Sequence, residues 1–125
     1  MSIKRLATHV AGGAAIAAAM AAFTVVPAHA ADTYVAIYYS APEYAYGWAN
    51  NAPTRADAEA AAHDKCVYNG GTDCQMAAWA RNGCAALAHN ADTWHGGHGA
   101  TIAEAEQDAL ALNNGGSIFI EKCST

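Results

Sequence analysis

Three histidines close together in the sequence carry the clearest potential for chemistry in this chain. His89, His95 and His98 fall within ten residues and lie beside Trp94. Imidazole is largely deprotonated near neutral pH and binds Zn²⁺ and Cu²⁺. The spacing matches no established zinc signature, and a glycine-rich loop also tolerates exposed polar residues. A metal-binding (Zn or Cu) secreted protein is therefore the alternative hypothesis for the function.

Catalysis by a nucleophile or by paired carboxylates finds little support in the sequence. The serines after residue 30 are Ser40, Ser117 and Ser124, and none lies in a G-x-S-x-G context. The carboxylates fall mostly on expected helix faces and first turns, where capping and solvation explain them. We therefore expect no catalytic residues, no enzymatic activity and no cofactor.

Aromatic residues are the better candidates for binding. Tyr44, Tyr46 and Trp48 alternate along an expected strand and so share one of its faces. Tyrosine and tryptophan are enriched in binding surfaces, although cross-strand aromatic pairs also simply stabilise hairpins. With Trp94, these residues support a non-enzymatic binding or effector module with a protein or glycan partner in the envelope or the host.

The first 30 residues have the pattern of a secretory signal peptide. Lys4 and Arg5 precede an almost wholly apolar stretch over residues 10–26, and Ala28-His29-Ala30 offers a small-x-small cleavage site. A membrane anchor is the rival interpretation, but no charged stop-transfer cluster follows. We expect cleavage after Ala30, no stable membrane insertion afterwards, and a secreted or extracellular protein, with association with the cell envelope as a further location.

All four cysteines follow the expected cleavage site. Cys66, Cys74, Cys84 and Cys123 would enter an oxidising compartment, which favours two disulfides. Three connectivities are possible, and we favour Cys66 with Cys74 and Cys84 with Cys123. A zinc-thiolate site would require closely spaced C-x2-C pairs, which the sequence lacks.

The charge of the chain argues against nucleic acid as a partner. After residue 30, four basic residues face eleven Asp and Glu, a net charge of −7. Such a surface repels phosphate backbones and anionic lipid headgroups.

A short phrase occurs twice and indicates an internal repeat. Thr54-Arg55-Ala56-Asp57-Ala58-Glu59 and Thr101-Ile102-Ala103-Glu104-Ala105-Glu106 each follow an aromatic, glycine-containing segment and precede a Gly-Gly pair and a strand-like run. One supersecondary unit is therefore built twice, in halves of about 33–81 and 84–123. Together the halves form a single domain over residues 31–125.

Each half reads as strand, strand, helix, strand. The expected elements are strands at 33–39 and 44–49, a helix at 55–66, strands at 74–81, 84–89 and 93–97, a helix after Thr101 and a strand at 118–120. Asn82-Gly83 predicts a hairpin that pairs 74–81 with 84–89. We expect an α+β fold in which two contiguous units, related by a pseudo-two-fold axis, share one mostly antiparallel sheet, with two disulfides.

Several motifs in order resemble a known family. They are Ala36-Ile37-Tyr38-Tyr39-Ser40, Tyr46-Gly47-Trp48, the helix that begins Pro53-Thr54-Arg55-Ala56, the Cys74 strand, Asn82-Gly83-Cys84-Ala85-Ala86-Leu87-Ala88 and Cys123. Together they are similar to the domain of unknown function 4189, in particular its small secreted mycobacterial type. The resemblance implies a secreted actinobacterial protein with a two-unit αβ fold that acts outside the bacterium. It implies no catalytic residue, and the histidines of residues 94–99 depart from its pattern.

Mass spectrometry of the exported protein tests the leader and the cysteines together. We expect a mature chain that begins at Ala31 and gains two hydrogens per disulfide on reduction. An intact leader, or an unchanged mass on reduction, would contradict these expectations.

Overall fold

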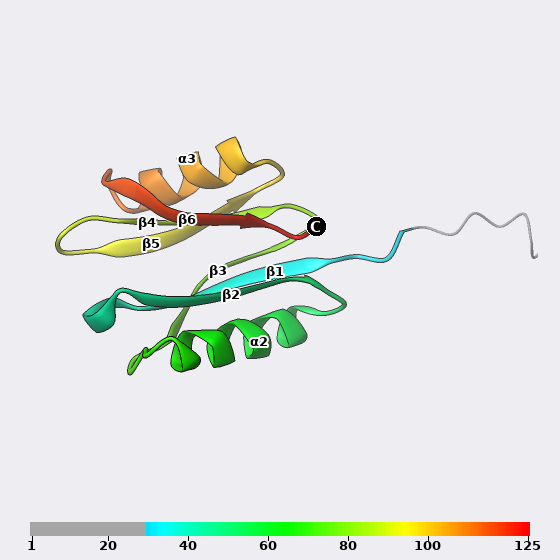
Figure 1. Ribbon diagram of the computed structural model, residues 1–125. Coiled ribbons are helices and arrows are strands. Elements are labelled where there is room, and N and C mark those ends of the chain that lie inside the picture. Colours follow the sequence, from blue (N-terminus) through cyan, green and yellow to red (C-terminus); the bar gives the residue numbers. More distant parts are fainter. Residues whose placement is uncertain (1–29) are drawn as a thin grey trace, which may run out of the picture. The chain divides into compact units, whose positions relative to one another are not determined.

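The computed structural model describes residues 30–125 (Figure 1). The signal peptide expected over residues 1–30 lies outside the described residues apart from Ala30. None of the helices in the described range is long and apolar enough to cross a membrane.

Within this range the chain forms two units with the same order of elements. The first contains β1 (Tyr34–Ser40), a 3₁₀ turn η1 (Ala41–Glu43), β2 (Ala45–Ala52), α2 (Arg55–Tyr68) and β3 (Gln75–Arg81). The second contains β4 (Cys84–His89), β5 (Trp94–Gly99), α3 (Ile102–Leu112) and β6 (Ser117–Cys123). In each unit the first strand is central and pairs antiparallel with the other two. The predicted α+β fold with two similar units is confirmed.

The arrangement of the sheets corrects one expectation. The strands of residues 30–125 form two three-stranded sheets, β2-β1-β3 and β5-β4-β6, and not one shared sheet. The predicted hairpin between β3 and β4 is also wrong, since each strand pairs within its own unit. Asn82 has a positive φ of 51°, but Gly83 does not, and a Cβ at Gly83 would lie 2.5 Å from the Gly99 carbonyl oxygen. Asn82-Gly83 therefore carries the chain from one sheet to the other.

The two sheets pack face to face, and each helix covers the outer face of the sheet in its own unit (Figure 1). Side chains from both units fill the core between the sheets: Val35, Ile37, Tyr39, Ala78, Ala80, Ala85, Leu87 and Ile120. Because side chains alternate along a strand, Ala36 and Ala86 face the helices instead. The described residues thus form successive layers of helix, sheet, sheet and helix.

Small residues form the contact between each helix and its sheet. Ala58 and Ala62 of α2 are fully buried. A Cβ atom at Gly47 of β2 would overlap the main chain of α2, so only a glycine fits this close approach. Ala105 and Ala109 of α3 are buried in the same way. Each helix therefore lies directly against its sheet.

A threonine directly before each helix caps its first turn. The Thr54 hydroxyl accepts a hydrogen bond from the Asp57 N–H at 3.1 Å, and the Thr101 hydroxyl accepts one from the Glu104 N–H at 3.2 Å. These bonds satisfy N–H groups that have no partner within the first turn of a helix.

The end of the chain fastens the two units together. The Ser124 N–H donates to the Gly83 carbonyl, and the Ser124 carbonyl accepts from the Asn51 N–H, both at 2.7 Å. The Asn50 side chain donates to the Cys123 carbonyl at 3.2 Å. Residues 123–124 thus join the far end of β2 to the connection between the units.

Cys66 is bonded to Cys74, and Cys84 to Cys123, which is the pairing favoured from the sequence. The first bridge ties α2 to the segment before β3, across a separation of 8 residues. The second joins paired positions of β4 and β6, across a separation of 39 residues.

Loop length predicts unequal contributions from the two bridges. In the chain-entropy model the longer loop contributes about 4 kcal/mol and the shorter about 2.5 kcal/mol. In urea unfolding, we expect Cys84→Ala/Cys123→Ala to lose about 1 kcal/mol more unfolding free energy than Cys66→Ala/Cys74→Ala. An equal or reversed order would contradict loop closure as the main source of this stability.

Candidate binding site

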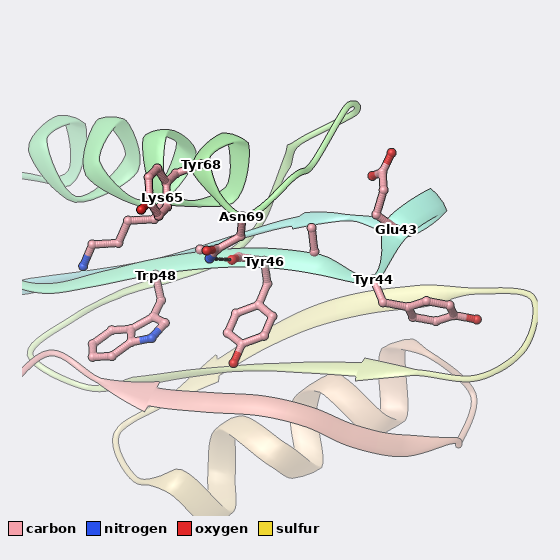
Figure 2. Close-up of a pocket in the computed structure, with 9 residues that line it drawn as sticks. Glu43, Tyr44, Tyr46, Trp48, Lys65, Tyr68 and Asn69 are labelled. Atoms are coloured by element: carbon pink, nitrogen blue, oxygen red, sulfur yellow. Dashed lines mark hydrogen bonds between the residues drawn. The ribbon is translucent and has the colours of Figure 1, made fainter.

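A groove of about 650 Å³ lies along β2, the edge strand of the first sheet (Figure 2). Its lining comes from β2 and the turn before it, and from the end of α2. We call it the aromatic groove and define it by Tyr44, Tyr46, Trp48, Lys65, Tyr68 and Asn69. Its volume is typical of ligand sites. The structure thus brings the three aromatic residues singled out around β2 into one place.

The groove depends on how β2 meets α2. Gly47 lies against α2, whereas the Tyr46 and Trp48 side chains project from β2 toward the second sheet (Figure 2). Because α2 approaches closely at Gly47, side chains at the end of that helix reach the strand. Asn69 shows this directly, since its Nδ2 donates to the Tyr46 carbonyl at 2.8 Å.

Aromatic packing supports the rings from the second sheet. Tyr46 meets Phe119 edge to face, with ring centres 5.3 Å apart, and Tyr44 meets His89 at 6.2 Å. Phe119 lies at an irregularity in the pairing of β4 with β6, where the register shifts. Tyr44 remains 59 % exposed and Tyr68 90 % exposed. Tyr44 and Tyr46 are thus held by packing against the second sheet. Tyr44 and Tyr68 leave exposed ring surface that a ligand can contact.

Two lysines flank Trp48. The Lys122 Nζ lies 4.2 Å from the centre of the indole ring, and the Lys65 Nζ lies 5.3 Å from it. Both distances allow a cation–π interaction. Trp48 itself is half-buried and packs against the core between the sheets. The groove therefore combines aromatic surface with positive charge.

Glu43 also lines the groove and fixes the chain there. Its carboxylate accepts hydrogen bonds from the Ser40 hydroxyl at 2.5 Å, from the Thr72 N–H at 3.2 Å and from the Thr72 hydroxyl. The fully buried Ser40 Oγ also accepts from the Asp73 N–H at 2.9 Å. The hydrogen bonds from Ser40 and Thr72 lower the pKa of Glu43 below its usual value of 4.5. This network holds the residue that directly precedes Tyr44.

Trp94 lies outside the aromatic groove. Its ring meets that of Tyr39 edge to face, with centres 5.5 Å apart, and it packs against the core between the sheets. It lines a separate cavity of about 70 Å³, together with Tyr44 and His89. Trp94 therefore shares a cavity with Tyr44 but does not line the aromatic groove.

The three clustered histidines have different neighbours. His89 packs on Phe119, and its Nδ1 has no hydrogen-bond partner among the described residues. The His95 Nδ1 lies 3.0 Å from Asn113 Oδ1, and the His98 Nδ1 lies 3.8 Å from Asp108 Oδ2. Across residues 30–125, no three His, Cys, Asp or Glu side chains are placed to hold a metal ion. The metal site suggested for these histidines is therefore not formed.

Sequence reasoning missed Lys65, Tyr68, Asn69 and Lys122. The first three stand at positions i, i+3 and i+4, a spacing that places them on one side of the end of a helix. That spacing was a usable signal. The sequence held no such signal for Lys122, because only the packing of the two sheets brings it to Trp48.

The family model for a domain of unknown function, DUF4189, matches residues 34–123. The chain belongs to the DUF4189 family. Mycobacterial relatives include Protein Rv1269c of Mycobacterium tuberculosis and Protein Mb1300c of Mycobacterium bovis. Each is 40 % identical over 97 residues, which cover 78 % of this chain and 74 % of the relative.

A solved structure supports the two-unit fold for this DUF4189 chain. The NMR structure of Rv1813c from Mycobacterium tuberculosis matches it with a TM-score of 0.59 and 35 % sequence identity. The match covers 78 % of this chain and 80 % of that chain. Because DUF4189 denotes a domain of unknown function, the function must be argued from the groove.

Acid should remove the contribution of Glu43 to stability. Its folded pKa is depressed, so the carboxylate stabilises the domain above the usual value of 4.5, and the effect is lost as pH falls through the folded pKa. We expect Glu43→Gln to lower the unfolding free energy at neutral pH but to match the original protein in strong acid.

The control is Asp92→Asn, in the exposed turn between β4 and β5, where the carboxylate accepts none of the hydrogen bonds observed in residues 30–125. A Glu43→Gln deficit that stays constant across the acid range would contradict the assigned network.

Proposed function

We propose that this protein is a secreted, non-enzymatic module that binds a partner in the cell envelope or the host through the aromatic groove. The observation that carries the proposal is the gathering of exposed tyrosines in one groove, with Lys65 in its lining and Lys122 over the ring of Trp48. Tyrosine supplies large, rigid contact area at low entropic cost, which is why binding surfaces use it heavily.

Secretion is supported by the signal-type leader in the sequence and by the two disulfides of the described domain. Disulfides persist in oxidising compartments and are rare in the bacterial cytosol.

The non-enzymatic assignment is supported by the roles of the reactive groups. The Ser40 hydroxyl, which lies beside a carboxylate, is fully buried and holds Glu43 and Asp73 in place. His95 and His98 each contact a residue at the end or side of α3, Asn113 and Asp108. Ser40, His95 and His98 thus make contacts that hold the fold together.

Tyr68 offers the sharpest test, because α3 provides a matched control. Tyr68 and Leu112 are each the last residue of their helix and are 90 % and 56 % exposed. With the exported protein immobilised, we expect Tyr68→Ala to retain about fivefold less material from envelope or host-cell fractions, as for loss of an interface aromatic.

Leu112→Ala should retain as much material as the original protein, and both variants should keep their unfolding free energy within about 0.5 kcal/mol. Unchanged capture by Tyr68→Ala, or an equal loss by Leu112→Ala, would reject the groove as the binding site.

A further inference from the structure

Positive charge is concentrated at the aromatic groove of an acidic domain. Four basic residues follow residue 30, and two of them, Lys65 and Lys122, converge on Trp48. They come from different units, Lys65 from α2 and Lys122 from β6. The fold thus places half of the basic side chains of residues 31–125 beside one indole ring.

The carboxylates near these lysines do not pair with them. Glu43, which lines the groove, is hydrogen-bonded to Ser40 and Thr72 instead. Arg55 is paired with Glu59 at 2.6 Å, and Arg81 lies 3.9 Å from Asp32. Neither Lys65 nor Lys122 has an acidic partner within 4.0 Å among the described residues. The two lysines are therefore available to an anionic group from outside the domain.

We propose that the aromatic groove binds a carboxylate-bearing saccharide. This inference rests on the proposed function and names the class of ligand. The exposed faces of Tyr44, Tyr46 and Tyr68 suit the C–H faces of sugar rings, and the ammonium groups beside Trp48 pair with the carboxylate. Asn69 adds a polar side chain to the same lining.

The main chain of β2 favours this ligand over an extended peptide. A peptide that adds to an edge strand needs free N–H and C=O groups along that strand. Asn69 already occupies the Tyr46 carbonyl, and the Ser124 carbonyl occupies the Asn51 N–H. At these two positions the main chain of β2 is not free to pair with an added strand.

Titration with defined oligosaccharides tests the proposal. The probes are oligomers of galacturonate, of guluronate and of alternating glucuronate, and the readout is the indole N–H signal of each tryptophan in NMR spectra of the exported protein. We expect at least one of these acidic oligomers to shift the Trp48 signal, while the signals of Trp79 and Trp94 stay in place.

Charge variants supply the second arm. Lys65→Gln and Lys122→Gln should each weaken binding about two- to fivefold, as for an exposed ion pair. Arg55→Gln is the matched control, because Arg55 lies 4.1 Å from the ring centre of Trp79, in the same kind of contact but away from the groove. It should leave the affinity unchanged.

The outcomes separate this inference from the proposed function. If an uncharged galactose oligomer binds as well as the acidic oligomers, the inference is wrong. It is also wrong if a glutamate peptide binds and none of the acidic oligomers does. In both cases the groove remains a binding site. No shift of Trp48 with any acidic oligomer also overturns the inference. If, in addition, Tyr68→Ala leaves the capture of envelope or host-cell material unchanged, both the saccharide inference and the proposed function are wrong.

Discussion

Direct contact between helix and sheet main chains is the constraint on which the rest of the structure depends. Ala58 and Ala62 place only methyl groups between α2 and its sheet, and Gly47 places none. A larger side chain at Gly47 would push α2 away from β2 and separate Asn69 from the Tyr46 carbonyl. Alanine and glycine at these contact positions are therefore a geometric requirement of the fold.

The two edges of the sandwich differ in how closely the two sheets approach each other. At the edge formed by β3 and β5, a Cβ atom at Gly96 would overlap the Ala77 carbonyl oxygen, so the main chains of the two sheets come close together at this point. At the edge formed by β2 and β6, Tyr46 packs on Phe119 and Lys122 lies over Trp48. Large side chains line this second edge, and the aromatic groove forms there.

Features that depend on near neighbours were predictable from the sequence, and features that depend on distant contacts were not. Thr54 and Thr101 mark the helix starts, because an N-cap bonds within its own first turn. The division into two sheets escaped prediction, because Asn82-Gly83 signals a turn without saying which strands pair. In the structure the Asn82 side chain accepts from the Thr33 N–H, a contact across 49 residues. For the same reason alternation along β2 indicated Tyr46 and Trp48, whereas Lys122 required knowledge of how the sheets stack.

The fastening at residues 123–124 has a consequence for folding. Ser124 links Gly83 to Asn51, and Cys123 is the partner of Cys84, so residues late in the sequence hold positions in and beside both units. Phe119 and Ile120 of β6 also pack into the core between the sheets. Contacts between residues so far apart in the sequence raise the contact order of the domain, which slows folding.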